Sequence, residues 1–230
     1  NARKILKAAG VDISLDPADF PFMTMREAHI AGLPVRIFRI SFTGELSYEI
    51  NIRARHGLAL WTHLMKAGAE FGITPYGTEA MHVLRAEKGF IIVGQETDGS
   101  VTPQDLGMDW IVSKVKPDYI GKRALERASM AADNRKQLVG LRTRERKQVI
   151  PEGAHAVLDP NQPMPMDMLG QVTSSYYSPN VASSIAMAML KGGRALMGGT
   201  VYLPMLDGSV IEAEVVEPIF YDPKGERLNG

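Results

Sequence analysis

The stretch that decides the fold of the first half is residues 35–52, which read VRIFRISFTGELSYEINI. Residues 35–40 are rich in β-branched and aromatic side chains, which favour a pleated strand. Residues 43–45, Thr-Gly-Glu, supply a turn, and over residues 48–52 apolar and polar side chains alternate at period two. The pattern predicts a hairpin-like strand pair with Glu49 on its polar face.

The segments before and after this hairpin have apolar side chains at helical spacing. Residues 3–9 predict a short helix that stops at Gly10. Residues 58–71 place apolar side chains three and four apart, which is typical of an amphipathic helix. A second helix is predicted from Thr78 to Gly89, with Arg85 near its C-terminal end.

The chain then loses regular periodicity. Residues 90–93 form a short apolar run that suits a buried strand, and residues 95–107 predict a polar loop. One more helix is expected over residues 121–130. Helices packed against several strands indicate an α+β fold for residues 1–133.

After residue 134 the pattern changes to short strand-like pieces between Gly and Pro turns. Such spacing predicts a small β-barrel or sandwich, here assigned to residues 134–230. We therefore expect two domains with a boundary near residue 133. The predicted strands are 138–141, 155–158, 170–174, 184–190, 201–206 and 210–216.

Composition excludes several classes of protein. The formal net charge is zero, so no global field attracts nucleic acid or an anionic membrane. Cysteine is absent, which removes disulfides, thiolate nucleophiles and Cys-type metal sites. The most apolar stretch, residues 181–190, is too short to cross a bilayer. A cytoplasmic location fits these features, and a start without Met suggests a piece of a longer protein.

Common catalytic and metal-binding motifs find no support. Residues 193–200 are Gly-rich but have Gly199 where a phosphate-binding loop needs Lys, and a strand follows them. Glu79 and His82 have the spacing of half a di-iron site, but no second half exists. The other histidines show no ligand spacing, so we predict no metal site.

Three segments carry a resemblance. Residues 39–50 are similar to the Tyr-Thr-Gly-Glu-x-x-x-Glu segment of the glycine cleavage T-protein folate-binding family, and residues 84–89 to its Leu-Arg-Leu-Glu-x-Gly helix. Residues 118–125 follow in the family's order, and the likeness continues through the β-rich end. It implies a T-protein-like folate-binding domain followed by a small C-terminal β-barrel.

The resemblance also implies ligand contacts. Glu49 matches the family's pterin-binding carboxylate, and a carboxylate can accept both adjacent N–H donors of a pterin edge. Arg85 matches an arginine that contacts the ligand. Phe42 stands where the family usually has Tyr, so its ring can pack on the ligand but offers no hydroxyl. Trp110 is a further candidate wall. The family's catalytic aspartate is expected upstream of Asn1, so no catalytic residue is named here.

Residues 41–49, 93–99 and 222–230 resemble the sarcosine oxidase alpha branch of this family. That branch implies oxidative demethylation of sarcosine, with transfer of the one-carbon unit to tetrahydrofolate to give methylenetetrahydrofolate and glycine. FMN, FAD and NAD are then expected in the full complex but not on this chain. The expected partners are the beta, gamma and delta subunits of a heterotetramer and a preceding part of the alpha chain. The isolated chain is expected to be inactive.

Three alternatives remain open. The chain could be an aminomethyltransferase of glycine cleavage, which would depend on a lipoyl carrier protein. It could serve a folate-dependent demethylase of another methylated substrate. A non-enzymatic assembly module that has lost folate is the third, and Phe42 keeps it open.

Overall fold

The structure is a computed structural model that describes residues 1–132 and 134–230. It divides into two compact units: Asn1–His82 with Lys224–Gly230, and Val83–Pro223. The chain passes from the first unit to the second within helix α3 (Thr78–Glu87). The domain boundary predicted near residue 133 falls on the one residue outside the described ranges, and this domain assignment stays a prediction.

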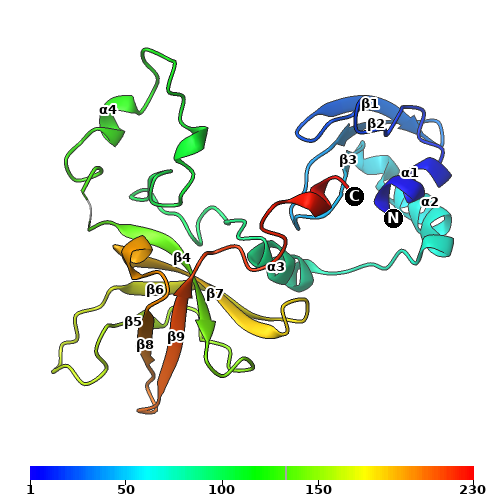
Figure 1. The fold of residues 1–230 in the computed structure, drawn as a ribbon. Coiled ribbons are helices and arrows are strands. Elements are labelled where there is room, and N and C mark those ends of the chain that lie inside the picture. Colours follow the sequence, from blue (N-terminus) through cyan, green and yellow to red (C-terminus); the bar gives the residue numbers. More distant parts are fainter. Residues whose placement is uncertain (133) are drawn as a thin grey trace. The chain divides into compact units, whose positions relative to one another are not determined.

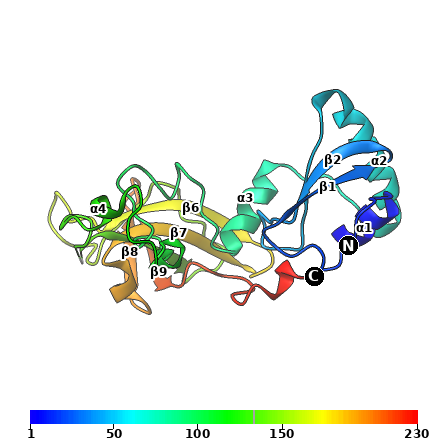
Figure 2. The same cartoon turned by 90° about the horizontal axis from the view of Figure 1, so that it is seen from above.

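The first unit is a three-stranded antiparallel sheet with helices on one face (Figures 1 and 2). Its strands are β1 (Met25–Ile30), β2 (Leu33–Phe38) and β3 (Glu49–Asn51), in that order. Helices α1 (Ala2–Ala8) and α2 (Gly57–Gly68) supply Leu6 and Leu60 to the core beneath the sheet. Short 3-10 turns are η1 (Ala54–His56), η2 (Ala69–Phe71) and, from the C-terminal segment, η5 (Glu226–Leu228).

The predicted hairpin is confirmed by the pairing of β2 with β3. Ile37 lies opposite Ile50, and Phe38 lies opposite Glu49. The helix predicted over residues 58–71 is also confirmed, as α2 followed by η2, and Gly72 ends it with φ of 70°. Strand β1 was not predicted.

The second unit contains a six-stranded antiparallel sheet that closes into a barrel (Figure 1). The sheet order is β5-β6-β7-β4-β9-β8. Its two edges meet where Val157 and Tyr202 exchange backbone hydrogen bonds of 2.8 and 3.0 Å, so the sheet closes on itself at this point. The strands are β4 (Lys136–Thr143), β5 (His155–Ala156), β6 (Gly170–Ser178), β7 (Ser183–Lys191), β8 (Thr200–Pro204) and β9 (Val210–Val216), which confirms all six predicted ones.

Two apolar clusters hold the second unit together. One fills the barrel, with side chains such as Leu141, Leu190 and Leu203 fully buried. The other lies outside it, where Ala86 of α3 packs against Ile185 and Met187 of β7. The C-terminal end of α3 is therefore part of the barrel's outer packing.

Two predicted elements differ from the structure. Residues 90–93 form no strand: the only pairing there is an isolated bridge of Val93 with Thr97, and Val93 is 86% exposed. Gly89 and Gly94 flank this run with φ of 70° and 94°, so the backbone turns at both ends and the run cannot extend into a sheet. Helix α4 spans only Lys122–Leu125, and a 3-10 turn η3 covers Asp109–Ile111. A last 3-10 turn, η4, covers Gly193–Leu196.

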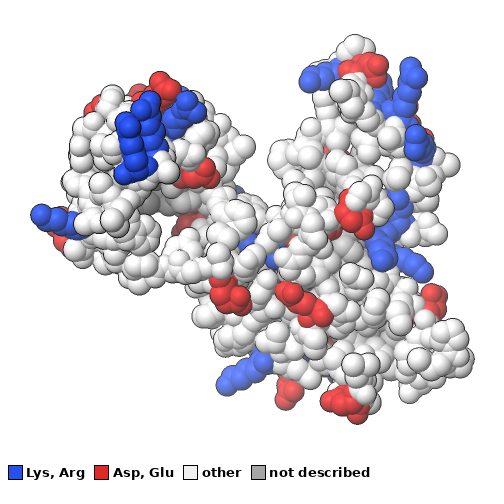
Figure 3. Space-filling view, turned by 180° about the vertical axis from the view of Figure 1, so that it is seen from behind, with Lys and Arg blue, Asp and Glu red and all other residues white. Residues whose placement is uncertain are grey.

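The surface carries charges of both signs. Figure 3 shows Lys and Arg interspersed with Asp and Glu, with broad uncharged areas between them. This distribution agrees with a net charge of zero and shows no extended basic face in that view. No helix among the described residues is long and apolar enough to cross a membrane.

Candidate functional site

Glu49 lies on β3 with its side chain exposed. Because side chains alternate along a strand, Glu49 and Asn51 share one face while Ile50 packs toward the core. The Asn51 side-chain amide donates a 2.8 Å hydrogen bond to Oε1 of Glu49. Within the described residues no hydrogen bond reaches Oε2, so this carboxylate keeps acceptor capacity for a ligand.

Asn51 also lines a groove of about 690 Å³ in the first unit. At another part of its wall, His29 contacts Asp12 through its backbone N–H at 2.6 Å and its ring Nδ1 at 2.9 Å. The backbone hydrogen bond, and then the ring contact, hold the pKa of Asp12 below its ordinary value. The groove therefore keeps an ionised carboxylate on the unit that carries Glu49.

Phe42 lies in the loop between β2 and β3 and is 47% exposed. The loop, residues 39–48, contains the turn that precedes Glu49. An apolar ring of this exposure can lose more water-accessible surface if a flat ligand covers it. Glu49 and Phe42 thus both lie in the first unit and both present accessible atoms.

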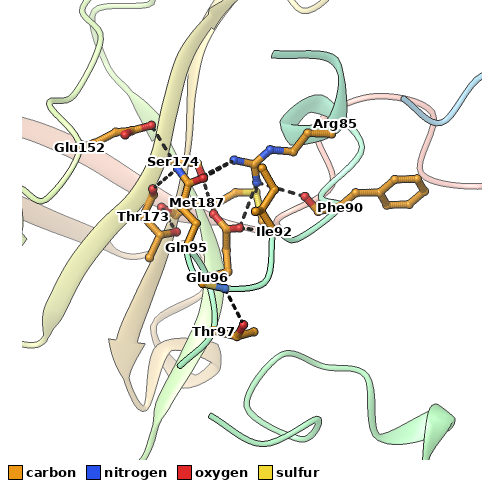
Figure 4. A network of polar contacts seen from close by, with 11 residues as sticks. Arg85, Phe90, Ile92, Gln95, Glu96, Thr97, Glu152, Thr173, Ser174 and Met187 are labelled. Carbon is orange, nitrogen blue, oxygen red and sulfur yellow. Dashed lines mark hydrogen bonds and ion pairs between the residues drawn. The ribbon is translucent and has the colours of Figure 1, made fainter. Parts of the chain in front are cut away.

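Arg85 lies in a buried polar network. Its side chain is fully buried in the second unit, where Nη1 donates to Glu96 Oε2 at 3.1 Å and Nη2 donates to Ser174 Oγ at 2.6 Å (Figure 4). Nη1 also donates to the Phe90 carbonyl at 3.1 Å. These contacts join α3, the following loop and strand β6. Direct contact of Arg85 with folate stays a prediction, and the contacts present are structural.

Glu96 is the partner that the sequence did not reveal. Its Oε2 accepts the Ile92 backbone N–H at 2.7 Å as well as the Arg85 donor, and its Oε1 accepts the Ser174 hydroxyl. In the sequence it is one acid within a polar loop. A buried carboxylate needs such a set of donors, because an unpaired charge in the interior is strongly unfavourable.

Trp110 lies on η3 in the second unit and is 74% exposed. Val115 and Ile120, a few residues later, are exposed as well. This segment contributes no buried residue to the three apolar clusters among the described residues. Whether Trp110 packs on folate stays a prediction.

A polar cavity of about 390 Å³ lies in the second unit beside this network. Its wall includes Gln95, Asp105 and Arg135. Burial raises the pKa of Asp105, but hydrogen bonds from Arg135 and Thr102 outweigh it and hold that pKa below the ordinary value. Among the described residues, no group of three or more His, Asp or Glu side chains is arranged to hold a metal ion.

The comparisons with known proteins now decide the family. Residues 1–116 match the family model described as the GCVT N-terminal domain. Residues 136–222 match the glycine cleavage T-protein C-terminal barrel domain. The chain belongs to the glycine cleavage T-protein family. Both the T-protein-like fold and the C-terminal barrel expected from the sequence are confirmed.

Relatives within the T-protein family come from several enzymes. The chain is 46% identical over 226 residues to the sarcosine oxidase subunit alpha of Corynebacterium sp. (strain P-1), covering 96% of this chain and 23% of that one. It is 33% identical to human mitochondrial dimethylglycine dehydrogenase, covering 99% of this chain and 26% of that one. The aminomethyltransferase T structure from Bartonella henselae matches with a TM-score of 0.78 at 25% identity, covering 95% of this chain and 56% of that one.

Proposed function

We propose that this chain is the tetrahydrofolate-binding part of a sarcosine oxidase. In this proposal it holds tetrahydrofolate so that N5 captures the one-carbon unit released when the N-methyl group of sarcosine is oxidised. The products are methylenetetrahydrofolate and glycine. The similarity to a sarcosine oxidase alpha subunit over 96% of the chain supports this choice of substrate.

The single observation that carries the binding proposal is the exposed carboxylate of Glu49. The Asn51 amide donates a hydrogen bond to one oxygen of this carboxylate. This contact orients the Glu49 side chain and leaves acceptor positions on the carboxylate for a ligand. A pterin edge presents two adjacent N–H donors, and a carboxylate accepts such a pair in a charge-assisted, two-bond contact. Phe42 is the proposed apolar surface for the flat ring system.

The role proposed for the chain is positioning. Holding tetrahydrofolate beside the electrophilic carbon raises its effective concentration, and enclosure keeps water from consuming that carbon. The oxidation itself requires a flavin. We assign FMN, FAD and NAD to other parts of the complex. No catalytic base is proposed within this chain.

We further propose that the chain works inside a larger assembly with beta, gamma and delta subunits in the cytoplasm. The chain spans about a quarter of the sarcosine oxidase alpha and dimethylglycine dehydrogenase relatives that it matches. The exposed apolar side chains Val115 and Ile120 lie in residues 113–127, a segment with five basic and two acidic side chains. Such a surface suits a partner with an apolar, acidic-rimmed contact area.

A second candidate function is aminomethyltransfer in glycine cleavage, which the likeness to aminomethyltransferase T favours. A demethylase of another methylated amine is favoured by the dimethylglycine dehydrogenase relatives. Substrate tests separate these functions: sarcosine oxidation coupled to methylenetetrahydrofolate formation supports our proposal. Dependence on a lipoyl carrier protein would support aminomethyltransfer instead.

The binding site is tested by Glu49→Gln in the full complex. Gln keeps the shape but replaces one acceptor with a donor and removes the charge, so we expect tetrahydrofolate affinity to fall about 10- to 100-fold, since hydrogen bonds to charged groups contribute about 1.5–3 kcal/mol. Reduction of the flavin by sarcosine should stay nearly unchanged. The matched control is Glu70→Gln, an exposed acid on η2. Unchanged folate affinity in Glu49→Gln would remove Glu49 from the site.

A further inference from the structure

The C-terminal segment Lys224–Gly230 folds onto the first unit, although the barrel precedes it in the sequence. Polar contacts with other residues of the first unit attach it there. Arg39 Nη2 donates to the Leu228 carbonyl, and Arg3 Nη2 donates to the Asn229 carbonyl at 3.3 Å. Arg227 forms an ion pair with Glu45. The segment is therefore held by residues from the opposite end of the chain.

Arg39 is the buried anchor among these contacts. It is 2% exposed, and its guanidinium lies 5.8 Å from the ring centroid of Phe22 and 5.4 Å from that of Tyr48. Within the described residues no carboxylate forms an ion pair with it, and burial lowers its pKa from the ordinary value. The Leu228 carbonyl is therefore an important polar partner, because a buried cation without acceptors is strongly unfavourable.

Two of these contacts, those of Arg39 and of Glu45, involve the loop that precedes Glu49. Arg39 begins the loop at the end of β2, and Glu45 belongs to its Thr-Gly-Glu turn. The last residue, Gly230, lies so close to Leu46 that a Cβ atom there would be 2.5 Å from Leu46 Cδ2. The C-terminal segment thus contacts the loop at its start and at its turn.

We propose that Lys224–Gly230 is a latch that fixes the loop 39–48 and so positions Phe42 and Glu49 for their ligand. Arg227 and Arg39 are then positioning residues, which act through the loop without touching the ligand. This inference rests on the proposed folate site, but its structural half does not need folate. Loss of the latch should loosen the loop in the ligand-free protein.

The test is charge reversal of the exposed pair in the full protein, which spares the buried Arg39. Arg227→Glu places two acids together, so we expect hydrogen exchange of peptides within residues 39–48 to accelerate and tetrahydrofolate to bind about two- to fivefold more weakly. Glu45→Arg should do the same. The double variant Arg227→Glu/Glu45→Arg restores the attraction and should restore both measurements. A bulk effect on stability would not produce this rescue.

The matched control is Arg144→Glu, which reverses one side of the exposed Arg144–Glu212 pair at 3.0 Å in the barrel. It should leave loop exchange and folate affinity at wild-type values. Unchanged exchange in Arg227→Glu, or failure of the double variant to restore it, would overturn the latch. A further outcome is that hydrogen exchange within residues 39–48 accelerates in Arg227→Glu and recovers in the double variant while Glu49→Gln leaves folate affinity unchanged. In that case the latch stands and the proposed folate site fails.

Discussion

Neutralising Glu96 is the sharpest test of how the second unit is held together. Glu96→Gln keeps the size of the side chain but removes the negative charge that faces the buried Arg85 at 3.1 Å. The side chains of both residues are fully buried, so water cannot replace the lost partner. Breaking a buried pair on one side typically costs about 3–5 kcal/mol. At about 2–4 °C per kcal/mol for a domain of this size, the unfolding midpoint should fall by roughly 10 °C.

The assay is thermal and denaturant unfolding of the full protein, with hydrogen exchange to report each unit separately. Strands β6 and β7 should lose protection in Glu96→Gln, while β1 and β2 keep theirs. Glu152→Gln is the control. This acid is exposed, and its hydrogen bond from the nearby Gln95 amide is long, at 3.5 Å. It should change stability by less than about 0.5 kcal/mol. A loss of less than about 1 kcal/mol in Glu96→Gln would refute a structural role for the pair.

Two further predictions concern the second unit. The pKa of Asp105 is lowered in the folded state, so its contacts with Arg135 stabilise the fold above about pH 3.9, the ordinary Asp value, and this contribution is lost as the pH falls through the folded-state pKa. In denaturant titrations from pH 7 to pH 2, the stability difference between wild type and Asp105→Asn should therefore shrink in acid, and a constant difference would contradict this. Val115→Asp and Ile120→Asp should weaken assembly of the full complex in sedimentation experiments, while the exposed Leu206→Asp should not. Equal effects of all three would argue against a docking surface on residues 113–127.

The sequence predicted those strands and helices whose own residues show a regular pattern of apolar and polar side chains. In β9, Ile211, Ala213 and Val215 are buried and alternate with polar residues, so both the strand and its inward face could be assigned. Strand β1 gave no such signal, because only Ala28 and Ile30 of its six residues are buried. Its pairing with β2 depends on tertiary contact more than on its own pattern.

The same distinction applies to the site. Glu49 could be placed on an exposed strand face from alternation alone. The burial of Arg85 could not be predicted, because its partner Ser174 is 89 residues away in the sequence and Glu96 looks like any acid in a polar loop. The ion pair of Arg227 with Glu45 joins residues 182 apart, which no local pattern reveals.

The central claim is that Glu49 binds the pterin of tetrahydrofolate, and a structure of the full complex with tetrahydrofolate bound tests it most directly. Our account predicts both carboxylate oxygens of Glu49 within about 3 Å of two pterin nitrogens, the usual length of such charge-assisted contacts, with Phe42 against the ring. A pterin bound elsewhere, with the Glu49 carboxylate facing only water, would contradict it.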